Sequence, residues 1–237
     1  MNWKIIRLEE TESTNIYINK VEGTDVVVIA DHQTAGKGMG TNTWESDAGQ
    51  NLLLSVKTSP KGVTAHDHFL LSMTGALALR DTLNEYAYGF TIKWPNDIYW
   101  HDKKISGTLI ETTITGRHVK DCIFGIGLNV NQHIFRSDAP NPISLCTIMG
   151  HDIDREQLLI RLLNHLEMWL SRIDDEVTIA KTYNASLYRN QGWYEYEDAD
   201  GRFMAMLKEV NAKGHLVLCD RQEKNREYDI KEVKFII

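Results

Sequence analysis

The chain has few cysteines, no long apolar run and no excess of basic residues. Its 237 residues include three cysteines, Cys122, Cys146 and Cys219, which lie far apart and form no CxxC pair. This usage is typical of a reduced cytoplasm and not of a disulfide-bonded secreted domain. No apolar run approaches the length that spans a bilayer, and Met1–Arg7 contains no secretory h-region. These absences predict a cytoplasmic protein with no membrane partner.

Basic residues are outnumbered by acidic ones. Twenty-six Lys and Arg stand against 33 Asp and Glu, for a net charge of −7. Without a basic cluster, this balance argues against nucleic acid as the main partner. A small anionic ligand can still bind in a local basic pocket. The length allows one large domain, or one domain followed by a small one.

Several well-known motifs are also absent. The nine histidines form no HExxH pair, so the sequence predicts no zinc site. GxxxxGK[ST] is missing and GxGxxG fails after Gly38, which excludes a Walker loop and a dinucleotide fingerprint. What is present is the glycine-rich stretch 36–40, directly after a β-branched strand predicted over Asp25–Ala30. With Lys37 between two glycines it is typical of an oxyanion cradle, and a flexible connector is the alternative.

The stretch Lys93-Trp94-Pro95-Asn96-Asp97 lies at the end of a predicted strand. Thr91–Trp94 is β-branched and aromatic, as a buried strand should be, and Pro95 ends regular pairing there. After a turn that holds Asn96 and Asp97, two strands are predicted over Ile98–Trp100 and Lys104–Ile114. A turn between strands presents side chains on a rigid support, where binding and catalytic groups tend to collect.

The side chains of this stretch suit a nucleotide. Lys93 and Lys104 can neutralise phosphate or carboxylate oxygens, and Asn96 can both donate and accept hydrogen bonds. Asp97 can hold Mg²⁺, which prefers carboxylate oxygens and its own waters. A surface hairpin with solvated charges is the alternative reading of the same residues.

The chain divides at residue 190. Residues 1–189 alternate strands with helices predicted over 65–86, 154–173 and 175–189, whereas residues 190–237 read as short strands with turns. The second part is too small for much of a core of its own, and we expect a small β-barrel docked on the first domain.

Other segments carry further predictions. Ser13 or Thr14 is the expected N-cap of a helix, and a helix start can also bind a polar ligand. The strand predicted over 118–130 contains glycines, which indicate close approach of a ligand or another backbone. Its edge is a candidate for pairing between subunits, so monomer and homodimer both stay open. Residues 137–150 are expected to form a loop and then a short apolar turn.

Together these segments resemble the biotin–protein ligase family. The residues that carry the resemblance are Ser13-Thr14-Asn15, Gln33–Gly38 with Trp44, Lys93–Asp97, Lys104 with Gly107, and Gly125–Asn129. The similarity covers most of the chain. It implies an α+β fold, with a mixed β-sheet flanked by helices (class II aminoacyl-tRNA synthetase/biotin ligase-like) followed by a small SH3-like β-barrel. It also implies the monofunctional type, because the pattern begins at about Trp3 and leaves no room for an N-terminal DNA-binding domain.

The resemblance implies an ATP-dependent reaction in two steps. Biotin and Mg-ATP form biotinyl-5′-AMP and release pyrophosphate. The ε-amine of a lysine on a biotin carrier domain of a carboxylase then attacks the mixed anhydride, and AMP leaves. Biotin, ATP and Mg²⁺ are therefore the implied ligands, and the carrier domain is the implied partner.

The resemblance also implies three sets of site residues. The catalytic residues are Lys37, Asp97 and Lys104, with Asp97 also the metal ligand. The biotin contacts are Ser13, Thr14, Asn15, Gln33, Gly36, Lys37, Gly38, Lys104 and Gly107. The ATP contacts are Lys37, Trp44, Lys93, Asn96, Asp97 and Asn129.

One position departs from the family pattern, and two other functions stay open. The pattern GRGRxG reads Gly36-Lys37-Gly38-Met39-Gly40-Thr41 here, so Met39 stands where a second basic residue is usual. We expect weaker retention of the adenylate, offset by another basic residue. The alternatives are a lipoate–protein ligase and a non-catalytic biotin-binding sensor. The C-terminal β segment and Lys93–Asp97 favour biotin, and a sensor needs no phosphate or magnesium site.

Overall fold

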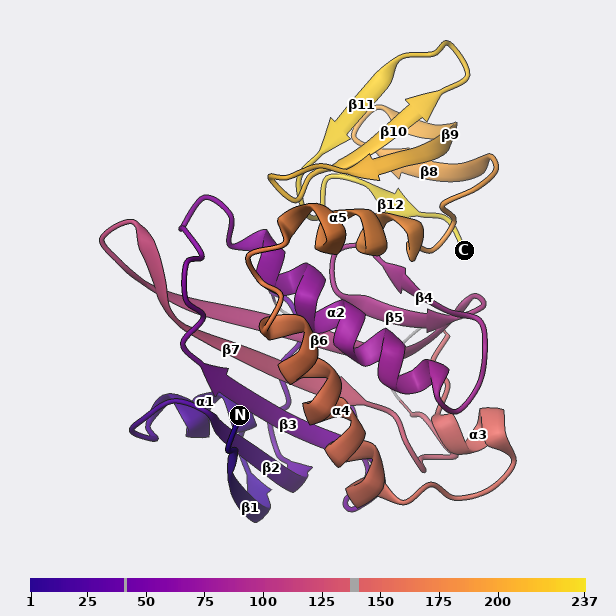
Figure 1. The fold of residues 1–237 in the computed structure, drawn as a ribbon. Coiled ribbons are helices and arrows are strands. Elements are labelled where there is room, and N and C mark those ends of the chain that lie inside the picture. The colour runs from indigo at the N-terminus through magenta and orange to yellow at the C-terminus, as the bar shows by residue number, and fades with distance from the viewer. Residues whose placement is uncertain (41, 137–140) are drawn as a thin grey trace.

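The computed structural model describes residues 1–40, 42–136 and 141–237, whose strands form two sheets (Figure 1). The larger sheet has the strand order β1-β2-β3-β7-β6-β5-β4. Its strands are β1 (Lys4–Thr11), β2 (Val26–Gln33), β3 (Leu52–Thr58), β4 (Phe90–Lys93), β5 (Asp97–Trp100), β6 (Lys103–Thr115) and β7 (His118–Leu128). β1 and β2 are parallel and the other neighbours antiparallel, which confirms the predicted mixed sheet.

Helices cover both faces of this sheet. They are α1 (Thr14–Asn19), α2 (Phe69–Asn84), α3 (Leu145–Met149), α4 (Arg155–Leu170) and α5 (Glu176–Ala185). α2 and α4 pack together on one face, in front of the sheet in Figure 1. Val27 of β2 belongs to the core beneath these helices, whereas Val26 and Val28 pack with Ile18 of α1 on the other face. The β-branched run of β2 is therefore buried on both sides, as its composition predicts.

Two helix starts differ in how they are capped. Asp154 caps α4 as predicted, because its side chain accepts from the backbone N–H groups of Glu156 and Gln157. Ser13 holds the N-cap position of α1, but its side chain makes no capping hydrogen bond. The N–H of Thr14 instead donates to Gln33 Oε1 at 2.7 Å. The start of α1 is thus tied to the end of β2.

Several elements differ from their predicted bounds, and α4 and α5 end at Leu170 and Ala185 and not at residues 173 and 189. α2 begins at Phe69, later than the apolar pattern predicts, because Thr64 and Asp67 close a turn through a 2.6 Å side-chain hydrogen bond. The apolar turn predicted within 137–150 is helix α3, and residues 137–140 of that segment lie outside the described residues.

The prediction that the segment 123–130 offers an edge for subunit pairing is wrong. β7 lies between β3 and β6, and its residues pair on both sides, as Gly125 does with Ser55 and Leu109. The edges are β1 and β4. The segment after α5 lies beside β4, since the N–H of Ile92 donates to the carbonyl of Ser186 at 2.9 Å. Strand order depends on long-range pairing, which a local apolar pattern does not reveal.

The C-terminal strands form a five-stranded antiparallel sheet in the order β11-β10-β9-β8-β12. They are β8 (Tyr194–Asp198), β9 (Gly201–Val210), β10 (Leu216–Asp220), β11 (Asn225–Tyr228) and β12 (Lys234–Phe235). The predicted second β unit is confirmed. Trp94 Nε1 donates to the carbonyl of Gly214 at 2.9 Å, and Asn184 of α5 exchanges two hydrogen bonds with Val210. The small sheet is therefore docked on α5 and on the end of β4.

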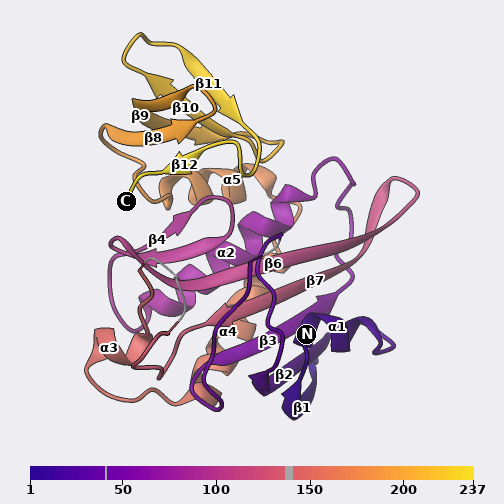
Figure 2. The same cartoon turned by 180° about the vertical axis from the view of Figure 1, so that it is seen from behind.

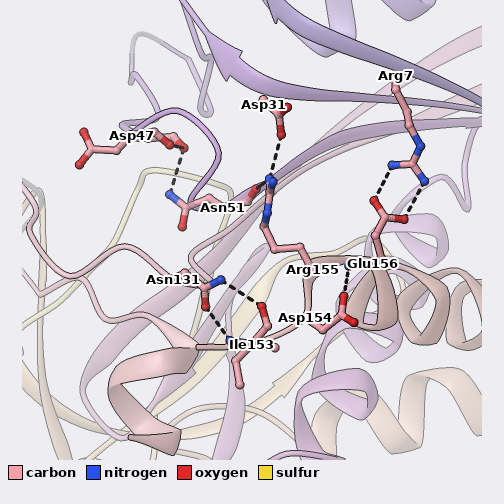
Figure 3. A network of polar contacts seen from close by, with 10 residues as sticks. Arg7, Asp31, Asp47, Asn51, Asn131, Ile153, Asp154, Arg155 and Glu156 are labelled. Carbon is pink, nitrogen blue, oxygen red and sulfur yellow. Dashed lines mark hydrogen bonds and ion pairs between the residues drawn. The ribbon is translucent and has the colours of Figure 1, made fainter. Parts of the chain in front are cut away.

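A polar network joins the N-terminal strands to the start of α4 (Figure 3). Arg7 of β1 donates to both carboxylate oxygens of Glu156, at 2.6 and 2.7 Å. Arg155 donates to Asp31 at 3.0 Å and to the carbonyl of Asn51 at 3.2 Å. These contacts hold the end of β2 and the start of β3 against α4. No helix in the described ranges is long and apolar enough to cross a bilayer.

Candidate active site

A cavity of ≈ 480 Å³ lies on the sheet face opposite α2 and α4. Its walls come from the start of α1, the glycine-rich loop, the Lys93–Asp97 turn and residues 230–235 of the C-terminal sheet domain. Most of the predicted site residues line it: Ser13, Thr14, Asn15, Gln33, Lys37, Gly38, Trp44, Lys93, Asn96, Asp97, Lys104 and Gly107. Residues predicted from separate motifs therefore meet in one place.

Two predicted residues lie beside this cavity. Gly36 is not among the residues that line it. An added Cβ at Gly36 would stand 2.8 Å from the carbonyl oxygen of Trp44, so only glycine fits there. Asn129 lines an adjoining cavity of ≈ 260 Å³, whose wall also includes Trp44, Asp97 and Lys104. The two cavities share these three residues and Thr43.

The floor of the main cavity is bare backbone. Gly107 of β6 and Gly127 of β7 are register partners, and both line the cavity. The indole of Trp44 lies on this floor, since a Cβ on Gly127 would overlap it. A Cβ on Gly107 would stand 3.2 to 3.3 Å from Asp97, Lys104 and Trp44. Gly127 has no room for a side chain where Trp44 lies, and a Cβ on Gly107 would require its neighbours to shift by a few tenths of an ångström, so another group approaches the main chain closely at both positions.

Neutral polar side chains gather at the α1 end of the cavity. Thr14 Oγ1 lies 3.1 Å from Gln33 Oε1 and 2.8 Å from Ser55 Oγ, and Ser55 Oγ lies 2.5 Å from Asn15 Oδ1. Ser13, Thr14, Asn15 and Ser55 are all buried. Sequence reasoning missed Ser55, whose one signal is a hydroxyl inside the otherwise apolar start of β3. This end is built for a ligand edge that donates and accepts hydrogen bonds without carrying charge.

The glycine-rich loop folds back on itself over the cavity. Gly38 N donates to Asn42 O at 2.8 Å, and Trp44 N donates to Gly36 O at 2.9 Å. Residue 41 of the predicted loop lies outside the described residues. The segment between β2 and β3 crosses the sheet face that Figure 2 presents. Lys37 and Trp44 thus stand on the two arms of one hairpin, and both face the cavity.

Charged groups occupy the opposite end. Lys104 Nζ lies 2.7 Å from Asp97 Oδ1, and these side chains are 32% and 18% exposed. Asp97 is predicted to lie in the turn but is the first residue of β5, which begins one residue earlier than the predicted strand. Lys93 Nζ lies over the rings of Tyr99 and Phe235, at 5.4 and 4.8 Å from their centroids. Burial lowers the pKa of Lys93, and the nearby carboxylate of Asp97 opposes this shift.

Asn96 has a structural partner as well as a place in the cavity wall. The side-chain amide of Asn96 donates to the backbone carbonyl of Thr108. The backbone N–H of Thr108 donates to the backbone carbonyl of Asn96 at 3.1 Å. The Trp94–Pro95 peptide bond before it is cis. Asn96 therefore fixes the turn against β6 and holds Asp97 beside Lys104.

Sequence reasoning missed one wall of the cavity. Ile230, Lys231, Val233, Lys234 and Phe235 line it from the segment between β11 and β12 and from β12 itself. No local motif marks these residues, because the C-terminal part is predicted as a separate small unit. Two added lysines make the cavity more basic than the predicted residues alone.

Asp97 is the only carboxylate that lines the main cavity among the described residues. One carboxylate suits Mg²⁺ that arrives with phosphate oxygens and keeps several waters. A second group of metal-type ligands, His133, Cys146 and Asp152, lies elsewhere. Cys146 Sγ is 4.0 and 3.9 Å from the two ring nitrogens of His133, so neither nitrogen lone pair points at it.

Comparison with known proteins decides the family. Residues 6–129 match the biotin/lipoate A/B protein ligase family. Over 177 residues the chain is 31% identical to a biotin–[acetyl-CoA-carboxylase] ligase of Paracoccus denitrificans, covering 70% of this chain and 73% of that protein. The chain belongs to the biotin protein ligase family.

Other members of this family share less length or less sequence. The ligase-family chain is 35% identical over 151 residues to the bifunctional ligase/repressor BirA of Bacillus subtilis, covering 61% of this chain and 45% of that protein. It thus spans about half the length of that curated relative. A structure of the biotin protein ligase from Aquifex aeolicus in complex with biotin and ATP shares its fold. The TM-score is 0.83 at 24% identity, over 98% of this chain and 99% of that one.

Proposed function

We propose that this chain is an ATP-dependent biotin–protein ligase that makes biotinyl-5′-AMP and transfers the biotinyl group to a lysine of a carboxylase carrier domain. The observation that carries the proposal is the polarity of the cavity. Neutral hydrogen-bonding groups gather at one end, lysines and one carboxylate gather at the other, and bare glycine backbone lies between them. Biotin, with a neutral polar ring and an anionic tail, matches that order when its tail points to the lysines.

At the α1 end, the ureido edge of biotin would bond to Ser13, Thr14, Asn15 and Gln33. Ser55 supports them from β3, at 2.8 Å from Thr14 and 2.5 Å from Asn15. Gly38 and Gly107 leave room for the ligand, since neither presents a side chain, and Gly36 lets the two arms of the glycine-rich loop approach each other. The apolar dithiolane of lipoate could neither donate nor accept hydrogen bonds at the α1 end, so it would displace water from the hydrogen-bonding capacity that these polar groups do not use on one another, at a cost of about 1–3 kcal/mol for each group left unpaired. This is why biotin is favoured over lipoate.

In the first step the biotin carboxylate must meet the α-phosphate although both are anionic. Positioning and charge neutralisation are therefore the main catalytic needs. Lys37 and Lys104 would neutralise the reacting oxygens from two sides of the floor. Lys93 would bind phosphate oxygens, and Trp44 and Asn129 would hold the adenine through the shared cavity wall. The carboxylate oxygen then attacks phosphorus, and pyrophosphate leaves.

Asp97 has two proposed roles. Magnesium enters with ATP, and Asp97 would be its protein ligand while Asn96 holds that carboxylate in place. When bound, the ion would neutralise phosphate charge and help pyrophosphate to leave. In the second step the carrier lysine would attack the carbonyl of the mixed anhydride as a neutral amine, and AMP would leave. Asp97, the one carboxylate that lines the main cavity among the described residues, would receive the proton of the amine.

The remaining proposals concern context. We place the boundary between the catalytic domain and the C-terminal SH3-like domain at residues 189 and 190, supported by the change to a separate sheet after α5. We propose action in the cytoplasm, supported by three unpaired cysteines. The acidic balance argues against nucleic acid as the partner, and membership of the ligase family supports a carrier protein. Monomer and homodimer remain alternatives.

The deciding experiment is mass spectrometry of an apo carrier domain incubated with this protein, Mg-ATP and biotin, with lipoate in a parallel tube. A mass gain with biotin alone supports the proposal. A gain with lipoate alone overturns the substrate and keeps the reaction. No gain in either tube, with biotin binding still detectable, favours a biotin-binding sensor.

A further inference from the structure

Lys231, in the segment between β11 and β12, reaches the glycine-rich loop. A Cβ built on Gly40 would overlap Lys231 Nζ and stand 3.3 Å from Lys231 Cε. The two residues are far apart in the chain, Gly40 in the segment between β2 and β3 and Lys231 in the segment between β11 and β12. The ammonium group of Lys231 therefore sits beside the loop backbone, at the position next to Met39.

The backbone of the C-terminal segment is held so that it presents this side chain. Lys231 has φ +76°, which is uncommon for a residue other than glycine. The flanking turn is closed by hydrogen bonds from Asp229 N to Glu232 Oε2 at 2.7 Å and from Glu232 N to Asp229 O at 3.1 Å. Val233, directly after it, is buried. A residue kept in a sparsely populated conformation by its surroundings is a candidate for function.

The charge of Lys231 is available to a ligand. Within the part of the chain that the structure describes, Lys231 makes no ion pair, whereas Lys104 pairs with Asp97 and Lys234 lies 3.8 Å from Glu197. Lys231 lines the same cavity as Lys37 and Met39. The loop itself carries a single cation, Lys37, because Met39 is neutral.

We propose that Lys231 binds the phosphate oxygens of ATP and of the adenylate in place of the basic residue that the loop lacks at Met39. The loop and the C-terminal sheet domain then hold the phosphates together. This inference rests on the proposed function. An ammonium-to-phosphate contact of this kind contributes roughly 1.5–3 kcal/mol, which corresponds to about a tenfold to hundredfold change in affinity.

The test replaces the charge and keeps the length. Lys231→Met should release biotinyl-5′-AMP about tenfold faster or more and raise the KM for ATP by a similar factor. Its affinity for biotin alone should not change, because the neutral end of the cavity lies apart. Lys208→Met, at an exposed position of β9 away from the cavity, is the matched control and should behave as wild type. Melting temperatures check that both variants fold.

A rescue separates a charge effect from a structural one. Met39→Arg should slow release from the wild type, and in the Lys231→Met background it should restore retention by returning a cation to the loop. Unchanged release from folded Lys231→Met would overturn the inference, and so would an equal loss of affinity for biotin alone. If the wild type forms no adenylate, the proposed function fails. Calorimetry with Mg-ATP then still tests whether Lys231 binds phosphate. Equal affinities for Mg-ATP in wild type and Lys231→Met would rule out that role.

Discussion

Lys104 is the residue whose removal separates catalysis from stability most clearly. Its ammonium group lies 2.7 Å from Asp97 and 5.7 Å from the centre of the Trp44 ring, at the point where the two cavities meet. The change Lys104→Ala removes a fixed positive charge from the place where the carboxylate and the α-phosphate must approach each other. It takes little from the hydrophobic core, to which Lys104 does not belong.

The expected magnitudes follow from this placement. Losing one preorganised donor to a developing charge lowers kcat by about 10²–10³-fold. The pair with Asp97 is partly exposed, so its loss should cost no more than about 1 kcal/mol of the free energy of unfolding. Lys104→Ala should therefore be a folded protein with very slow adenylate formation. Lys104→Arg, which keeps the charge but changes its shape, should recover part of the rate.

The assay is pyrophosphate release from Mg-ATP and biotin without a carrier, with urea unfolding as the measure of stability. Lys103→Ala is the matched control, because Lys103 is the neighbouring residue of β6 and is exposed outside the cavity. Wild-type pyrophosphate release from folded Lys104→Ala, or an equal loss in Lys103→Ala, would take Lys104 out of the mechanism.

Three further changes have predictable outcomes. Gly127→Ala should weaken biotin binding by about tenfold or more in calorimetry, because the new methyl group overlaps Trp44. An unchanged Kd would refute the claim that the cavity floor needs a glycine at this position. Lys93→Met should raise the free energy of unfolding at pH 7 by about 0.5–2 kcal/mol while slowing adenylate formation. Burial lowers the pKa of Lys93, so this gain should shrink as the pH rises toward the ordinary value of 10.5, and a gain independent of pH would contradict the reason given. Asp198→Asn should cost about 1–3 kcal/mol at pH 7, since it removes the negative charge that strengthens the 2.6 Å hydrogen bond from Tyr228 and the 3.2 Å ion pair with Arg226. That hydrogen bond lowers the pKa of Asp198, so in urea unfolding the difference from wild type should persist above pH 3.8 and vanish as the pH falls further.

Contacts in the site between residues that are close in sequence could be predicted, whereas contacts that depend on the order of the strands could not. Lys93, Asp97 and Lys104 are close in sequence and lie on the three consecutive antiparallel strands β4, β5 and β6, so their shared place follows from two successive turns. The placement of β7 between β3 and β6 depends on pairings across the whole domain. Ser55 joins the site through that same pairing, which a single hydroxyl in an apolar strand does not announce.

The C-terminal wall escaped prediction for a different reason. Residues 190–237 have the pattern of a small β unit, and that pattern contains no information on which surface it docks against. Its position is fixed by contacts such as the hydrogen bond from Trp94 to Gly214, between residues that no motif links. Lys231 is therefore visible in the structure and not in the sequence.

The floor formed by Gly107 and Gly127 limits how this cavity can be redesigned. A surface made of main chain has nothing that can be trimmed, so any substitution at either position makes the cavity smaller. Selection for a bulkier acid must then work on side chains in the walls, such as Leu109, which is the register partner of Gly125 and also lines the cavity. The floor sets the largest width that the site can offer, and evolution or engineering can only choose how much of that width to use.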